Sequence, residues 1–140
     1  MNETVNTDKA PVPVGKYPHA RKVGNLLFLS GVGPRRPGTN VIPGVMMDGQ
    51  GNAVGHDIEA QCHSVFENVK IILEESGSQW DNLVDITVFL TNMQRDFDVF
   101  NKIYGDYFVN NQPCRTTVEV TSLPTPIAIE LKCIATIEVG

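Results

Sequence analysis

The feature that most constrains the fold is a long amphipathic segment in the middle of the chain, from Asp57 to Gly77. Its apolar residues recur at intervals of three and four, which places them on one face of a helix. They are Ile58, Cys62, Val65, Phe66, Val69, Ile72 and Leu73. Asp57 is a suitable N-cap, and Gly77 is a suitable stop. The pattern predicts a helix that must bury one face against another layer of structure.

Two strands are predicted before this helix. Residues 26–31 form a short apolar run that ends at a glycine, which is typical of a buried strand. Residues 19–23 can pair with that run through a turn at Gly24-Asn25.

A long loop separates these strands from the helix. Residues 33–55 are rich in Gly, Pro and Asn, and only a short hairpin near 45–47 and 53–54 interrupts them. A loop of this length inside a small domain is more often functional than idle. We therefore expect part of a binding site within it.

The second half of the chain adds three strands and another helix. Residues 84–91 alternate, and the members of one side are Val84, Ile86, Val88 and Leu90. The second helix is predicted to open at Asp96 and to bury an aromatic stripe in the core. The stripe consists of Phe97, Phe100, Tyr104, Tyr107 and Phe108. Strands over 115–123 and 127–139 follow, with a turn at 124–126 between them.

The order of these elements favours an α+β fold in which both helices pack on one face of a mixed sheet. The other face must then be covered or solvated. Val118 and Ile134 are apolar residues expected on that other face. An oligomer that buries them is the simplest account of their position.

Composition limits the class of protein. A chain of 140 residues predicts a single domain over 1–140, in which 1–14 read as a polar, exposed lead-in. The net charge of -5 argues against nucleic acid as a partner, because phosphate binding needs a basic surface. The chain lacks the long apolar run of a membrane span and the apolar core of a secretion signal, so we expect a cytoplasmic protein.

Metal ligands and disulfides are not expected. Three cysteines without CxxC spacing indicate neither a disulfide framework nor a structural zinc site. His56 and His63 lie seven residues apart, too far to bind one ion from a helix face, and His19 stands alone. Cys114 follows a proline directly before an arginine, which could lower its pKa. Its role is left open.

Two charged residues are candidates for chemistry. Arg115 starts a predicted strand, where its guanidinium can donate two parallel hydrogen bonds to a carboxylate. The alternative is a surface arginine in a salt bridge. Glu130 lies inside an alternating strand, and partial burial would raise its pKa and let it accept a proton from water. The alternative for Glu130 is an exposed ion pair with Lys132.

From Tyr17 to Ile137 the chain resembles the reactive intermediate deaminase (Rid or YjgF) family. The resemblance rests on short blocks in a fixed order, which include GKYPHA, VGNLLFLSG, PCRTTVEVTSLP and IAIELKCIATI. It implies a six-stranded mixed sheet with two helices on one face, as in chorismate-mutase-like trimers. It also implies a homotrimer with ligand clefts between subunits and no metal or organic cofactor.

The resemblance also implies roles for individual residues. Arg115 would grip the carboxylate of a small-molecule substrate, and Glu130 would position the attacking water. Tyr17 and the backbone near Ser30 and Gly31 would line the cleft. Asn101 would support the arginine.

Within this family the chain looks most like the 2-aminomuconate deaminase branch, because of its long basic loop and the blocks DIEAQCHSVF and LPTPIAIELKCIAT. That branch would hydrolyse 2-aminomuconate to 4-oxalocrotonate and ammonia in aromatic degradation. The loop residues Arg35 and Arg36 would be candidates for the second carboxylate, the alternative being a solvated loop. Two other functions stay open: a general 2-enamino or 2-imino acid deaminase, and a non-catalytic trimer that binds small ligands or acts as a chaperone.

Overall fold

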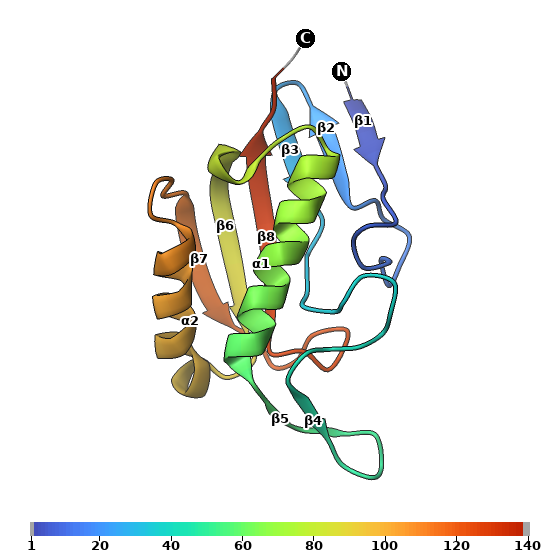
Figure 1. Ribbon diagram of the computed structural model, residues 1–140, viewed down its shortest axis with the longest axis vertical. Helices are drawn as coiled ribbons and strands as arrows, with labels where there is room; N and C mark the ends of the chain where they lie inside the picture. The colour runs from blue at the N-terminus through green and yellow to red at the C-terminus, as the bar shows by residue number, and fades with distance from the viewer. Residues whose placement is uncertain (1, 139–140) are drawn as a thin grey trace.

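The computed structural model describes residues 2–138 and contains one six-stranded sheet with two helices on the same face (Figure 1). The sheet order is β1-β2-β3-β8-β6-β7. Only β6 and β7 run parallel, and α2 connects them. The strands of the sheet are β1 (Asn2–Val5), β2 (Ala20–Val23), β3 (Leu26–Leu29), β6 (Leu83–Leu90), β7 (Cys114–Glu119) and β8 (Ile129–Thr136). The predicted α+β architecture is confirmed.

The helix α1 (Ile58–Glu75) lies over the sheet as the sequence pattern predicts. The side chain of Asp57 accepts a hydrogen bond from the backbone N–H of Ala60 at 3.2 Å, which caps the first turn. All seven residues of the predicted apolar face are buried. Gly77 has a φ of 81°, the left-handed conformation that ends helices.

The helix α2 (Met93–Tyr107) starts earlier than predicted, so the expected opening at Asp96 is wrong. Asn92 is the N-cap, and its side chain accepts from the backbone N–H of Arg95 at 2.9 Å. Asp96 is buried and instead receives two hydrogen bonds of 2.7 Å from the Arg95 guanidinium. The aromatic stripe packs on the core as expected, with Phe100, Tyr104 and Phe108 buried and the other two partly buried.

Most N-terminal residues are exposed, as predicted, but the segment is also tied to the sheet and the core. Residues 2–5 form the edge strand β1, which pairs antiparallel with β2. Val5 and Ala10 are buried in the core. The imidazole of His19 fixes the segment that follows, because Nδ1 accepts from the backbone N–H of Thr7 at 3.3 Å and Nε2–H donates to the carbonyl of Pro11 at 2.8 Å.

Strand boundaries also differ from the prediction. The pairing of β6 shifts register between Leu83 and Asp85. Leu83 is therefore 1% exposed, whereas Val84, expected on the same side as Ile86, is 40% exposed. The strands β7 and β8 are shorter than 115–123 and 127–139, although Ile127 is still buried. The predicted last strand also reached Val139, which lies outside the described residues.

The loop between β3 and α1 contains the predicted hairpin. It consists of β4 (Val45–Met47) and β5 (Ala53–His56), which project beyond the main sheet (Figure 1). Asp57, the α1 cap, donates its backbone N–H to the carbonyl of Gly44 at 2.7 Å, so the hairpin is attached to the start of the helix. No helix within residues 2–138 combines the length and apolarity needed to cross a membrane.

Cross-strand register defines two faces of the sheet. Ile86, Val88 and Leu90 of β6 are buried beneath the helices. Their partners on β8 and β7 point the same way because paired residues share a face. Residues between them point to the opposite, helix-free face. Val118 and Ile134 lie on that face, as predicted.

We expect Gly44→Ala to lower the free energy of unfolding by about 3 kcal/mol, because strain and overpacking add. Gly44 has a φ of 68°, and an added Cβ would lie 2.6 Å from the Cβ of Asp57 and 2.9 Å from its carbonyl oxygen. Gly24→Ala is the matched control, since its φ is 59° but nothing lies within 4 Å of the added atom. That control should lose only about 1 kcal/mol. Equal losses in urea denaturation would show that the contact with Asp57 is unimportant.

Candidate active site

Glu130 lies on the helix-free face of β8, opposite Phe89 of β6. Its carboxylate rests against the backbone of Gly31, where an added Cβ would be 2.8 Å from Oε2. The side chain is half-buried, and this burial raises the pKa of Glu130. A carboxylate whose pKa is raised is a better proton acceptor near neutral pH than an ordinary one.

The alternative of an ion pair between Glu130 and Lys132 is not realised. The ammonium of Lys132 donates to the backbone carbonyl of Leu29 instead. Within residues 2–138 Glu130 has no hydrogen-bond or ion-pair partner. The carboxylate is therefore available to a water or a ligand.

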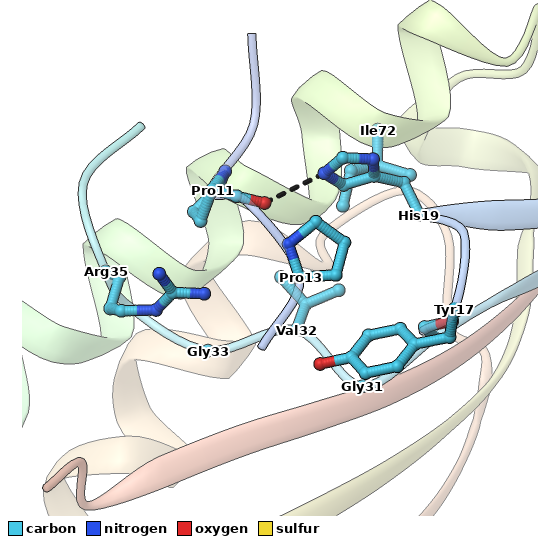
Figure 2. A pocket seen from close by; sticks show the side chains of 10 residues that line it. Pro11, Pro13, Tyr17, His19, Gly31, Val32, Gly33, Arg35 and Ile72 are labelled. Carbon is cyan, nitrogen blue, oxygen red and sulfur yellow. Dashed lines mark hydrogen bonds between the residues drawn. The ribbon is translucent and has the colours of Figure 1, made fainter. Parts of the chain in front are cut away.

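A pocket adjoins the same backbone segment at Gly31 (Figure 2). Its walls include Pro11, Pro13, Tyr17, Ser30, Gly31 and Arg35. Ser30 is held in place, since its hydroxyl donates to the carbonyl of Pro18 at 2.7 Å and its backbone N–H donates to the carbonyl of His19 at 3.0 Å. The Tyr17 hydroxyl accepts from the backbone N–H of Val14 at 3.2 Å. Three predicted cleft residues, Tyr17, Ser30 and Gly31, thus lie together.

Arg115 lies on β7 opposite Ile86 and extends across α2. Its Cζ atom is 4.7 Å from the ring centroid of Tyr104, 5.4 Å from that of Phe100 and 5.9 Å from that of Phe97. Cation–π contacts of this length orient a guanidinium without neutralising it.

Asn101 holds the same guanidinium by accepting a 2.9 Å hydrogen bond from Nη1 of Arg115. The predicted supporting contact between these two residues is therefore present. In the part of the chain that the structure describes, no carboxylate lies within salt-bridge distance of Arg115. The remaining N–H groups can receive an anion, and the alternative of a surface salt bridge is not formed.

Arg115 and Glu130 project from opposite faces of the sheet. Arg115 pairs with Ile86, which is buried under the helices, whereas Glu130 pairs with Phe89 on the other side. One chain therefore does not bring the two predicted catalytic residues together. A site that contains both must combine surfaces of two chains.

The loop arginines separate from each other. Arg35 lines the pocket with Tyr17, and its Nη2 donates to the carbonyl of Val12 at 2.5 Å. Arg36 is exposed and lies over a different, shallow depression beside His63 and Glu67. Only Arg35 is therefore near the other predicted binding residues.

Two buried amides on α1 shape this region and were not anticipated. Asn68 donates through Nδ2 to the carbonyl oxygens of Gly33 at 2.9 Å and Arg35 at 2.7 Å. Gln61 accepts from the backbone N–H of Ala128 at 2.8 Å, next to the start of β8. Both stand on the apolar face of the predicted helix, and a buried amide there needs backbone partners. A polar amide on an otherwise apolar helix face is therefore the sequence signal that could have predicted these contacts.

The remaining candidates for metal or thiol chemistry are dispersed. Among residues 2–138 no three His, Cys, Asp or Glu side chains gather as a metal site. Cys62 and Cys133 are buried, and this burial raises the pKa of each thiol to about 12. Cys114 is exposed on the helix-free face, opposite Asp85.

Comparison with known proteins places the whole domain among related chains. The family described as Endoribonuclease L-PSP matches residues 7–137. A RutC family protein of Saccharolobus solfataricus is 41% identical over 135 residues, which cover 96% of this chain and 98% of that relative. The chloroplastic Reactive Intermediate Deaminase A of Arabidopsis thaliana is 38% identical over 135 residues, 96% of this chain and 66% of that relative.

Solved structures share the fold. A Rid family protein, YyfA of Yersinia pestis, superimposes with a TM-score of 0.84 at 32% identity, covering 98% of this chain and 100% of that one. The TdcF protein of E. coli, crystallised with bound serine, gives a TM-score of 0.83 at 29% identity, covering 97% and 99% of the two chains. The six-stranded sheet with two helices is thus the fold of Rid proteins.

The Tyr104 ring supports Arg115, and its hydroxyl is buried without a hydrogen-bond partner in the described residues. We expect Tyr104→Phe to keep the ring contact and to raise the free energy of unfolding by about 1 kcal/mol, since an unsatisfied polar group is removed. Tyr104→Leu should lower it by about 2 kcal/mol through lost packing and cation–π contact. Chemical denaturation of both variants checks this. A destabilised Phe variant would mean that the hydroxyl has a partner.

Proposed function

This chain belongs to the endoribonuclease L-PSP family, the Rid group, and on that premise we propose that it hydrolyses small 2-imino or 2-enamino acids to 2-oxo acids and ammonia. The observation that carries the proposal is the unpaired, half-buried carboxylate of Glu130 against Gly31. The name of the Arabidopsis relative and the serine bound to the E. coli protein support the same chemical class. We place the reaction in the cytoplasm.

The proposed site lies between subunits of a homotrimer. Arg115 from the helix side of one chain would meet Glu130 on the helix-free face of the next, with Tyr17 and Ser30 of that second chain nearby. The support is geometric, because the two charged residues lie on opposite faces of one sheet. Val118 and Ile134 on the helix-free face supply apolar surface for such an interface.

Substrate binding would start at the guanidinium. Asn101 occupies one N–H of Arg115 and the aromatic rings fix its plane. The free N–H groups then bind the substrate carboxylate through two charge-assisted hydrogen bonds. This contact fixes the adjacent C=N carbon relative to the water at Glu130.

The chemical step requires only water and proton transfer. An enamine is first protonated at carbon and becomes an iminium. Glu130 then accepts a proton from water while the water oxygen bonds to the iminium carbon. Protonated Glu130 then returns its proton to the aminol nitrogen, and the C–N bond breaks as the C=O bond forms. Ammonia leaves, and the hydroxyl proton goes to solvent in place of the proton taken up at carbon. No metal or organic cofactor enters this proposal.

A narrower activity and two alternatives remain distinct from the main proposal. Hydrolysis of 2-aminomuconate would need a cation for its second carboxylate, and Arg35 is the loop arginine in the pocket. A non-catalytic trimer would bind the same acids without releasing ammonia. Cleavage of RNA, which the family description suggests, is disfavoured by the net charge of -5.

We expect Glu130→Gln to lower the rate of imine hydrolysis about 10²–10⁴-fold, the usual effect of losing a positioned general base. Imines formed in place by an amino-acid oxidase are followed by their decay and by ammonia release, after subtraction of the spontaneous reaction. Glu67→Gln is the control, because it makes the same chemical change at an exposed position on α1. Full activity in Glu130→Gln would exclude the assigned role of this carboxylate.

We expect Arg115→Ala and Glu130→Gln subunits to complement each other. Each variant alone should be inactive, but random trimers of the two should recover about a quarter of the wild-type activity, because three-quarters of them hold one intact site. Co-expression in equal amounts, followed by the same assay, measures this. An inactive mixture whose subunits demonstrably exchange would place the site within single chains.

A further inference from the structure

We propose that the pocket at Arg35 binds a second anionic group of the substrate, so that imino or enamino dicarboxylates are preferred over monocarboxylates. This inference rests on the proposed function and specifies its substrate class. Arg115 would take the carboxylate next to the C=N carbon. Arg35 would take the carboxylate at the far end.

The side chains that line the pocket favour binding of an anion. The guanidinium of Arg35 and the hydroxyl of Tyr17 extend toward each other over the backbone of Gly31–Gly33 (Figure 2). Both are hydrogen-bond donors, and no acidic side chain is among the lining residues. A carboxylate between them would receive charge-assisted hydrogen bonds.

The donors at this position are available. Within residues 2–138 the Arg35 guanidinium makes a single hydrogen bond, to the carbonyl of Val12. An arginine has five N–H groups, so most of them remain free. The Tyr17 hydroxyl accepts a bond from the backbone N–H of Val14 but donates its own hydrogen to no described group.

Hydrogen bonds from α1 to the loop backbone fix the position of Arg35. Its backbone carbonyl and that of Gly33 both accept from the buried amide of Asn68 on α1. Ser64, one turn earlier on the same helix, donates to the carbonyl of Pro34 at 2.7 Å. A binding residue anchored to a helix in this way keeps its geometry without a ligand.

The pocket adjoins the proposed reaction centre. Gly31 is part of the pocket wall and also the residue against which Glu130 rests. An anion at Arg35 and a water at Glu130 would therefore both adjoin Gly31. One extended substrate could then contact both.

The tests compare substrates within each variant. Imines formed in place from L-aspartate and from L-alanine supply a dicarboxylate and a monocarboxylate. For Arg35→Met we expect kcat/KM to fall about 10- to 100-fold for the dicarboxylate, the loss of hydrogen bonds to a charged group. The monocarboxylate value should change less than about threefold. Arg35→Lys keeps the charge and should restore part of the preference.

Arg36→Met is the matched control, because Arg36 is the neighbouring arginine but lies outside the pocket. A purely structural role of Arg35, through its bond to Val12, would lower both substrates equally and leave their ratio unchanged. An unchanged ratio in Arg35→Met would overturn the inference while the deaminase proposal stands. Absence of imine hydrolysis in the wild-type protein would instead overturn the deaminase proposal.

Binding gives a second readout that is independent of turnover. Succinate and propionate serve as unreactive probes in calorimetric titrations of the wild-type protein and of Arg35→Met. We expect succinate to bind about 10-fold or more tightly than propionate to the wild type, and the difference to disappear in the variant. Equal affinities in the wild type would contradict a second anion site.

Discussion

The alternation of side chains along β-strands is the constraint on which the rest of this structure depends. Successive residues of a strand point to opposite faces, and cross-strand partners share a face. The β8 residues Ile129, Leu131 and Cys133 are thereby buried under the helices, and Glu130 is excluded from the core. The same rule carries Arg115 of β7 to the helix side through its pairing with Ile86. The two candidate catalytic residues therefore lie on opposite faces of the sheet, and the proposed site between subunits follows from this arrangement. The same alternation places the apolar Val118 and Ile134 on the helix-free face.

A second dependence runs from the helix α1 to the loop. Gln61 and Asn68 interrupt an otherwise apolar face, and each uses a buried amide to hold backbone from another part of the chain. Such groups must be satisfied because an unpaired buried amide is costly. The irregular segment after β3 thus has a defined course even though it forms few regular elements. Arg35 owes its position to this anchoring.

Much of this arrangement could be predicted from the sequence, and the failures have physical causes. The periodicity of α1 and its cap at Asp57 are local properties, so they were predicted correctly. The face of Val84 was wrong because the register shift beside Leu83 depends on pairing with β8. The edge strand β1 was missed because its four residues follow no apolar alternation. The alternation of β8 predicts which of its residues share a face with Glu130. Whether Arg115 lies on the same face depends on the register between strands, which cannot be predicted from a local sequence pattern.

The division of Arg115 and Glu130 between two faces has a further consequence for how such a protein would be measured. If each site is shared, a diluted sample of folded but dissociated chains would have no competent site. Specific activity would then vary with protein concentration while spectroscopic signals of folding stayed constant. Enzyme activity would thus report the association equilibrium between chains, which cannot be obtained from the thermal stability of the single domain.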